Sequence, residues 1–203
     1  MKKILCFGDS NVFGFIAQSG DRYDEKTRWS GILKKLLKND YEVIEEGCNN
    51  RTCFCDNDAG IKQTGYKYLP CVLDESYDIL ILALGINDVQ KIYKTNEFDI
   101  EKGFEKILSI AKNKAPRAKI ILISPLELTK NVLCGYFSAL FDEESIEKSK
   151  NIAKICKKVA ENNNCLFLNL NEIKNTSLPD GLHYDIETHK KIAYFVFDLL
   201  RKI

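Results

Sequence analysis

The chain has 203 residues, 45% of them hydrophobic, and this length suits one domain, or at most two, with a full hydrophobic core. Its formal net charge is +1, and acidic and basic residues are mixed along the whole chain. This balance disfavours binding to nucleic acid or to an anionic membrane by bulk electrostatics. We therefore expect one compact domain spanning residues 1–203, with no nucleic-acid or membrane partner.

The first residues carry two lysines before a short apolar run, as secretory signal peptides do, but Asp9 interrupts the run before a full apolar region forms. We interpret this run as the first strand. No apolar stretch approaches the length of a membrane-spanning helix. We therefore expect a soluble protein and take the cytoplasm as its default location.

Apolar patterns of two kinds alternate along the chain. Short runs rich in β-forming residues predict strands that are buried on both faces, at residues 4–7, 41–44, 79–84, 120–123 and 166–168. Longer segments with apolar residues three and four positions apart predict amphipathic helices, at residues 29–38, 100–114, 143–162 and 186–202. This alternation predicts an α/β fold in which helices cover both faces of a mostly parallel, five-stranded sheet.

Eight cysteines are present, and most of them lie singly in apolar or helical contexts, which is typical of reduced thiols in a cytosolic protein. Cys48, Cys53 and Cys55 lie closer together. The spacing of the last two differs from that of a zinc knuckle and from that of a C-x-x-C redox pair. We therefore expect no metal site.

Ser10 follows Gly8 and Asp9 at the end of the first predicted strand. In a parallel sheet, ligands bind outside the carboxyl ends of the strands, so this hydroxyl could project into a binding site and act as a nucleophile. Serine also caps helices and occurs in turns, and taken alone Ser10 fits that structural role better.

His183 is one of two histidines, and it lies three residues after Asp180 in a Pro-Asp-Gly turn. A serine needs a base to be an effective nucleophile. Asp180 can reach Nδ1 of the imidazole and leave Nε2 facing the hydroxyl. The alternative makes Asp180 an N-cap and His183 a residue at the start of the last helix, and for this pair the two interpretations are equally good. We interpret His189 as a surface residue of that helix.

Acyl transfer also needs hydrogen-bond donors aimed at the oxyanion. Asn87 follows the third predicted strand and could offer a side-chain N–H, although an Asx turn with Asp88 would also explain it. Backbone N–H groups of Asn50 or its neighbours, after the second strand, and of Ser10 itself could complete the set.

Four blocks with these residues occur in a fixed order: Gly8-Asp9-Ser10, the Gly47 turn, Gly85-x-Asn87-Asp88 and Asp180-x-x-His183. Together they resemble the SGNH, or GDSL-type, hydrolase superfamily. Further segments bring the resemblance closest to the bacterial arylesterase and acyltransferase branch: Arg28-Trp29-Ser30-Gly31, Arg51-Thr52, Tyr68-Leu69-Pro70 and Ser124-Pro125. The resemblance covers nearly the whole chain.

The resemblance implies a three-layer α/β/α, flavodoxin-like fold and a serine esterase that hydrolyses small acyl or aryl esters through an acyl-enzyme. Acyl transfer to alcohols would be a further activity. Ser10 would be the nucleophile, His183 the general base and Asp180 the residue that orients it, with oxyanion donors on Ser10, Asn50 and Asn87. No metal or organic cofactor is implied. This branch is often homo-oligomeric.

The chain departs from the family at two positions. The family usually has a glycine that donates its backbone N–H where this chain has Asn50. Since Asn tolerates left-handed conformations, the donor can survive, while its side chain would narrow or polarise the acyl site. Asn11 follows the serine where many relatives have leucine or isoleucine, and we expect it to alter the pocket floor. We interpret Asp9 as a structural acceptor of turn N–H groups and not as a catalytic acid.

The substrate depends on three loops, at residues 11–28, 56–70 and 126–144, of which the last two are long enough to wall a binding site. Aromatic residues that could line an apolar pocket are Trp29, Tyr66, Tyr68, Tyr136 and Phe137. We expect Asn11, Trp29, Tyr136 and Phe137 to bind substrate. Short-chain and aryl esters are the first expectation, and a carbohydrate O-acetyl group, a lysophospholipid and a thioester are alternatives on the same site.

A non-catalytic ligand-binding module, or a nucleotide binder, on a flavodoxin-like scaffold is the alternative of a different class. No Gly-x-Gly-x-x-Gly or P-loop motif follows the first strand, which disfavours binding of a phosphate cofactor. The distance between the Ser10 hydroxyl and the His183 imidazole discriminates between an enzyme and such a module.

Overall fold

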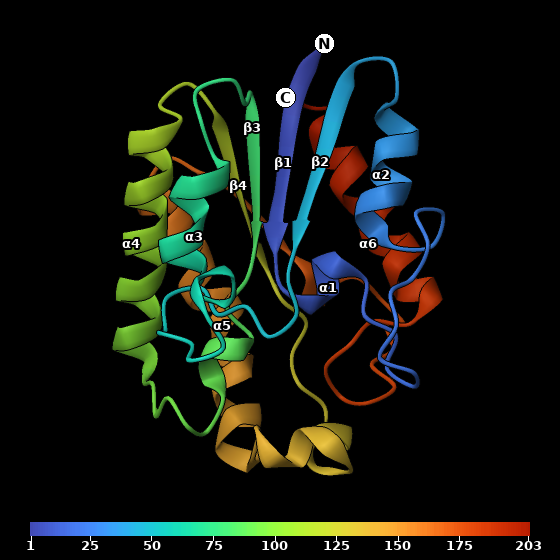
Figure 1. The fold of residues 1–203 in the computed structure, drawn as a ribbon, viewed down its shortest axis with the longest axis vertical. Helices are drawn as coiled ribbons and strands as arrows, with labels where there is room; N and C mark the ends of the chain where they lie inside the picture. Colours follow the sequence, from blue (N-terminus) through green and yellow to red (C-terminus); the bar gives the residue numbers. More distant parts are fainter.

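A parallel β-sheet of five strands forms the centre of the molecule (Figure 1). The computed structural model describes all residues, 1–203. The strands are β1 (Lys2–Gly8), β2 (Tyr41–Gly47), β3 (Ile79–Ala83), β4 (Lys119–Ser124) and β5 (Leu166–Asn169), in the spatial order β2-β1-β3-β4-β5. All neighbouring strands run parallel. The predicted α/β fold is confirmed.

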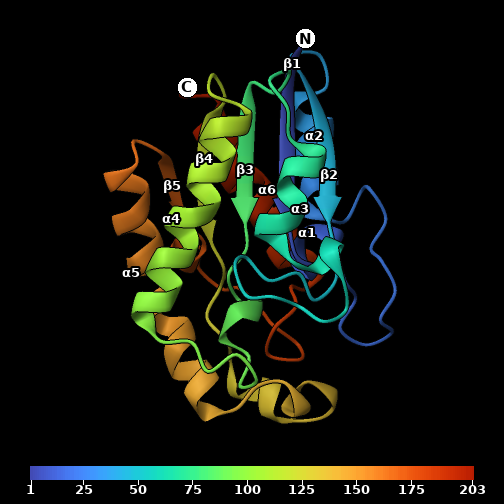
Figure 2. The same cartoon turned by 60° about the vertical axis from the view of Figure 1, so that its left-hand side comes forward.

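Six α-helices surround the sheet: α1 (Ser10–Phe13), α2 (Trp29–Leu37), α3 (Gly65–Val72), α4 (Glu97–Lys114), α5 (Glu143–Asn162) and α6 (Ile186–Leu200). Helices α3, α4 and α5 cover one face, and α2 and α6 cover the other (Figures 1 and 2). The sheet is therefore the middle of three layers. None of the helices is long and apolar enough to cross a membrane.

The inner strands β1, β3 and β4 are mostly apolar because each of them contributes to two cores. The edge strand β2 is buried only at Val43 and has an exposed Glu42, so the expectation that residues 41–44 are buried on both faces is wrong. Successive side chains of a strand point to opposite faces. In β1, Leu5 and Phe7 pack beneath α3, α4 and α5, whereas Ile4 and Cys6 pack beneath α2 and α6. Burial on both faces explains why the sequence pattern predicted the inner strands well.

Helix α3 was not predicted, because Pro70 lies inside it and residues 56–70 were expected to form a connection. A proline disfavours a helix interior since it lacks an N–H and clashes with the preceding turn. Here Gly65 and Leu69 are buried against the core, and this packing outweighs the local preference.

The two longest helices, α4 and α5, begin one turn or less from their predicted starts. Each begins at a capping box, formed by Asn96 with Asp99 in α4 and by Asp142 with Ser145 in α5.

The strand order determines where a ligand can bind. The chain passes from β1 to β2 on one side and returns to β3 on the other side of β1, so the carboxyl ends of β1 and β3 flank a crevice. Helix α1 starts at this edge. Gly47, at the end of β2, lets α1 approach closely, because a Cβ there would overlap the backbone of Val12 and Phe13.

Candidate active site

Three side chains from opposite ends of the chain form a continuous series of hydrogen bonds. The hydroxyl of Ser10 lies 2.9 Å from Nε2 of His183, and Nδ1 of His183 lies 2.7 Å from Oδ2 of Asp180. Ser10 and His183 are both buried. The structure thus brings together the three side chains that were predicted to act as nucleophile, base and orienting carboxylate. In this geometry the imidazole can take the serine proton as the hydroxyl attacks a carbonyl.

The carboxylate of Asp180 is held from both sides. Its Oδ1 accepts hydrogen bonds from the backbone N–H groups of Leu182 at 3.0 Å and of His183 at 2.8 Å. Burial raises the pKa of Asp180, but hydrogen bonds from the imidazole and from these N–H groups outweigh it and leave the pKa below its usual range. The ionised carboxylate therefore accepts the proton of Nδ1, which leaves Nε2 as the acceptor facing Ser10.

Neither structural alternative fits the observed caps. The N-cap of α6 is Asp185, whose side chain accepts the N–H of Thr188, so Asp180 does not cap this helix. The N-cap of α1 is Asp9, whose carboxylate accepts the N–H of Asn11 at 2.8 Å. The interpretation of Asp9 as a structural acceptor is confirmed. Ser10 is left as the first residue of α1, with its hydroxyl directed at the imidazole.

The side chain of Asn87 is held in one orientation and keeps one unused donor. Its Nδ2 donates to the backbone carbonyl of Arg51 at 3.1 Å, and its Oδ1 accepts from Nε2 of Gln90 at 3.0 Å. Because the Arg51 carbonyl can only accept, it must face the NH₂ group of Asn87. The second hydrogen of that group has no protein acceptor.

Two backbone N–H groups without a protein acceptor belong to residues that line the same cavity as Asn87. The N–H of Ser10 is at the start of α1, where the first N–H groups have no partner within the helix. The N–H of Asn50 makes no hydrogen bond within the protein. Ser10, Asn50 and Asn87 line the same cavity. Unused donors that converge on a cavity indicate a position for an oxygen ligand.

Asn50 adopts the left-handed conformation that was expected of it, with a φ of 60°. Its side-chain Oδ1 accepts a hydrogen bond from Nε2 of Gln90 at 2.7 Å. Gln90 was not predicted as a site residue, because a single polar residue in a loop carries no pattern that separates it from other loop residues. Its position three residues after Asn87 was the only indication available.

A cavity of about 300 Å³ opens beside Ser10. Its apolar walls are Phe15, Tyr136, Phe137, Leu140, Phe141 and Leu182. The ring of Phe15 lies 4.2 Å from that of His183, centroid to centroid, and the ring of Phe137 lies 5.1 Å from it. Tyr136 is 81% exposed and forms the rim. Two of the four residues expected to bind substrate, Tyr136 and Phe137, thus lie at this cavity.

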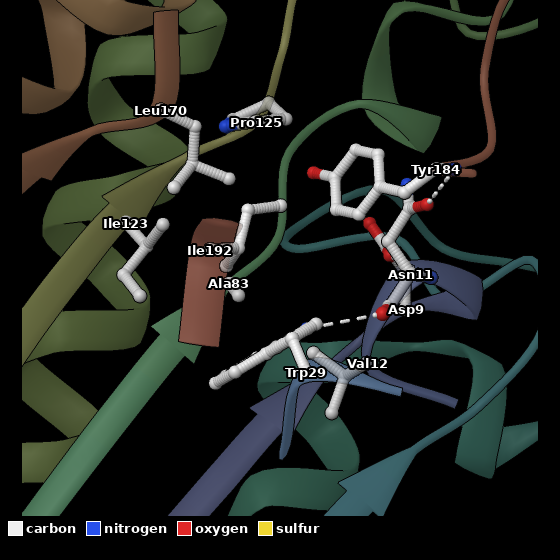
Figure 3. A pocket seen from close by; sticks show the side chains of 10 residues that line it. All are labelled: Asp9, Asn11, Val12, Trp29, Ala83, Ile123, Pro125, Leu170, Tyr184 and Ile192. Carbon is white, nitrogen blue, oxygen red and sulfur yellow. Dashed lines mark hydrogen bonds between the residues drawn. The ribbon is translucent and has the colours of Figure 1, made fainter. Parts of the chain in front are cut away.

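The other two, Asn11 and Trp29, do not line it, and the expectation that they bind substrate is corrected. They border a separate, small cavity of about 10 Å³ that is also lined by Asp9 and Tyr184 (Figure 3). The indole Nε1 of Trp29 donates to the Asn11 carbonyl at 3.1 Å, and the Asn11 side chain donates to the carbonyl of Leu182 at 3.3 Å and accepts the N–H of Tyr184 at 3.2 Å. Asn11 therefore ties α1 to the segment that carries His183.

Three further residues differ from their predicted places. Tyr68 stacks on Phe7 with a ring distance of 6.4 Å, and Tyr66 donates its hydroxyl to Asp56, so neither tyrosine lines the cavity. His189 is buried and not on the surface, since it lies on the face of α6 that packs against the core. Its Nδ1 accepts the N–H of Trp29 at 3.3 Å, and burial lowers its pKa to about 3, so it is neutral.

Comparison with known proteins identifies the family. Residues 6–191 match the model of the GDSL-like Lipase/Acylhydrolase family. The chain belongs to this family. It is therefore a hydrolase that acts on carboxylic esters, and a non-catalytic binding module finds no support.

Solved structures of esterases are similar over the whole chain. The native M. smegmatis aryl esterase has 26% sequence identity and a TM-score of 0.90, with 100% of this chain and 99% of that chain covered. A carbohydrate acetylesterase family member from Sinorhizobium meliloti has 29% identity and a TM-score of 0.89, with 100% of this chain and 98% of that chain covered. No curated protein sequence matched the chain.

The carboxyl of Asp9 makes the stability of this site depend on pH. Burial raises its pKa to about 7, although the N–H of Asn11 and the charge of Arg51 act in the opposite direction. In the unfolded chain the pKa of this carboxyl is about 3.9. Because the folded state favours the protonated carboxyl, its contribution to the free energy of unfolding is fully present below about pH 3.9 and is lost as the pH rises to about 7. At about 1.4 kcal/mol per pKa unit, the loss is at most about 4 kcal/mol.

We therefore expect Asp9→Asn, which keeps an acceptor for the Asn11 N–H but cannot ionise, to gain thermal stability relative to the wild type as pH rises from about 4 to about 8. Thermal unfolding followed by circular dichroism at each pH measures this difference. Asp198→Asn, at an exposed position, serves as the control. A difference between Asp9→Asn and the wild type that stays constant over this pH range contradicts the assignment.

Proposed function

We propose that this family member is a serine esterase in which Ser10 is the nucleophile, His183 the general base and Asp180 the residue that orients the imidazole. The observation that carries the proposal is the contact of 2.9 Å between the Ser10 hydroxyl and Nε2, continued at 2.7 Å to Asp180. The cavity of about 300 Å³ beside Ser10 provides space for a small ester.

The chemistry proceeds in two balanced steps. Oγ of Ser10 bonds to the ester carbonyl carbon while its proton passes to Nε2 of His183. The bond to the leaving oxygen then breaks, and Nε2 returns the proton to the departing alcohol, which leaves an ester on Ser10. Water attacks this acyl-enzyme in the same way, with His183 again taking and returning a proton, and releases the carboxylic acid.

Three donors are available for the oxyanion that forms in each step. They are the backbone N–H groups of Ser10 and Asn50 and the unused hydrogen on Nδ2 of Asn87. Their freedom from protein acceptors supports this role, because a donor that is already bonded gains little from a new negative charge. Each such donor contributes about 3 kcal/mol to the barrier reduction.

We expect Ser10→Ala to lower kcat for p-nitrophenyl acetate by at least about 10⁴-fold, because no other group can form the acyl-enzyme. Release of p-nitrophenol measures the rate. Ser30→Ala is the matched control, since Ser30 is also buried and its hydroxyl only donates to the carbonyl of Val12 in α1 at 3.4 Å. A Ser10→Ala variant that keeps the wild-type rate overturns the proposal.

For the substrate we propose esters with a short acyl chain, including aryl esters. The cavity beside Ser10 is small and lined by aromatic and aliphatic side chains, and the rings of Phe15 and Phe137 flank His183. Similar proteins named aryl esterase and carbohydrate acetylesterase support the same class. We further propose transfer of the acyl group to alcohols, since burial of Ser10 and His183 limits the access of water.

Phe137 should limit the length of the acyl chain, because its ring stands beside the imidazole in the cavity wall. We expect Phe137→Ala to raise kcat/KM for p-nitrophenyl hexanoate relative to the acetate by about 10-fold, as filling the vacated space recovers about 1 to 3 kcal/mol. Tyr136→Ala, at the exposed rim of the same segment, should change this ratio much less. An unchanged ratio in Phe137→Ala would place the acyl chain elsewhere.

A further inference from the structure

We propose that Gln90 is a positioning residue of the active site. A single buried carboxamide holds the side chains of both asparagines that border the oxyanion position, Asn50 and Asn87. The inference rests on the proposed function, because it concerns donors for the oxyanion of ester hydrolysis. It assigns a role to a residue that belongs to none of the four motif blocks.

The geometry around Gln90 uses both hydrogens of one NH₂ group. Nε2 of Gln90 lies 2.7 Å from Oδ1 of Asn50 and 3.0 Å from Oδ1 of Asn87. Gln90 is only 2% exposed, and it follows the short 3-10 turn Asn87–Val89 at the end of β3. A buried amide whose two donors are both satisfied is held in one orientation, because rotation would leave polar groups unpaired.

Gln90 determines which face of the Asn87 amide reaches the cavity. With Oδ1 bonded to Gln90 and one hydrogen bonded to the carbonyl of Arg51, only the second hydrogen on Nδ2 remains free. Without the donors of Gln90, the Arg51 carbonyl alone would hold the amide. The free hydrogen would then point at the oxyanion in only part of the population, and the preorganisation on which such donors depend would be lost.

Gln90 also restrains the side chain of Asn50. Asn50 lines the cavity beside Ser10, so an unrestrained side chain there would occupy space needed by the substrate. Its Oδ1 is bonded to Gln90, and its backbone carbonyl accepts from Nδ2 of Asn57 at 2.8 Å. Both ends of Asn50 are thereby fixed, which keeps its φ of 60° and leaves its N–H free to donate.

The test replaces Gln90 with a side chain of similar length that has no donor. We expect Gln90→Met to lower kcat for p-nitrophenyl acetate by about 10-fold to 100-fold, less than full removal of an oxyanion donor, with KM little changed. Gln90→Glu should lower kcat further, since its carboxylate would face two carbonyl oxygens. If Gln90→Met does not fold, Gln90→Glu is measured in its place.

Two comparisons separate positioning from a general loss of structure. In an Asn87→Ala background, Gln90→Met should lower kcat by a smaller factor, because one of the two residues through which it acts is gone. Thr95→Val is the matched control: Thr95 is buried in the same segment, and its hydroxyl donates to the carbonyl of Asp88 at 2.8 Å. This variant should lower the thermal midpoint without the loss of kcat.

Wild-type kcat in Gln90→Met, or an equal fold-loss with and without Asn87, overturns the proposal that Gln90 positions both asparagines. Ser10→Ala is measured in the same series. If Ser10→Ala is inactive while Gln90→Met and Gln90→Glu hydrolyse at the wild-type rate, the positioning role alone is wrong. If Ser10→Ala remains active, the proposed function is wrong, and the role proposed for Gln90 is wrong as well.

Discussion

The hydrogen bond between Ser10 and His183 joins residues that are 173 positions apart. The surrounding structure holds these two side chains at hydrogen-bond distance. Ser10 is carried by α1 at the end of the inner strand β1, and His183 by the turn before α6. Asn11 connects the two segments directly through Leu182 and Tyr184. A displacement of either segment would break this contact, and the two hydrogen bonds of the Asn11 side chain oppose such a displacement.

Buried charges organise the loops around this contact. The guanidinium of Arg51 donates to the carbonyl of Gly8 at 2.9 Å and to that of Glu46 at 2.5 Å, and so links the ends of β1 and β2. The carboxylate of Asp88 accepts three consecutive backbone N–H groups, those of Cys53, Phe54 and Cys55. Irregular backbone can be buried only when its polar groups are paired, and two charged side chains supply many of the partners here.

The sequence predicted the sheet and the main helices because their apolar residues recur with a period that packing requires. It predicted the active-site residues only as separate motifs, since the distance between Ser10 and His183 depends on how the whole chain folds. The predictions for Trp29, in the substrate pocket, and for His189, on the surface, were wrong. A local pattern does not show that a side chain with polar atoms lies on the face of a helix that packs against the core. Gln90 was missed for a related reason: its role arises from two partners, Asn50 and Asn87, that only the folded structure brings to it.

The proposed function requires that Ser10 is a nucleophile activated by His183. Labelling with a fluorophosphonate tests it most directly, because the reagent forms a bond between phosphorus and an activated serine oxygen as fluoride leaves, and the adduct can be located by peptide mass spectrometry. We expect one adduct per chain, on Ser10, and its loss in His183→Gln. An adduct on another residue, or equal labelling of Ser10 with and without His183, would contradict it.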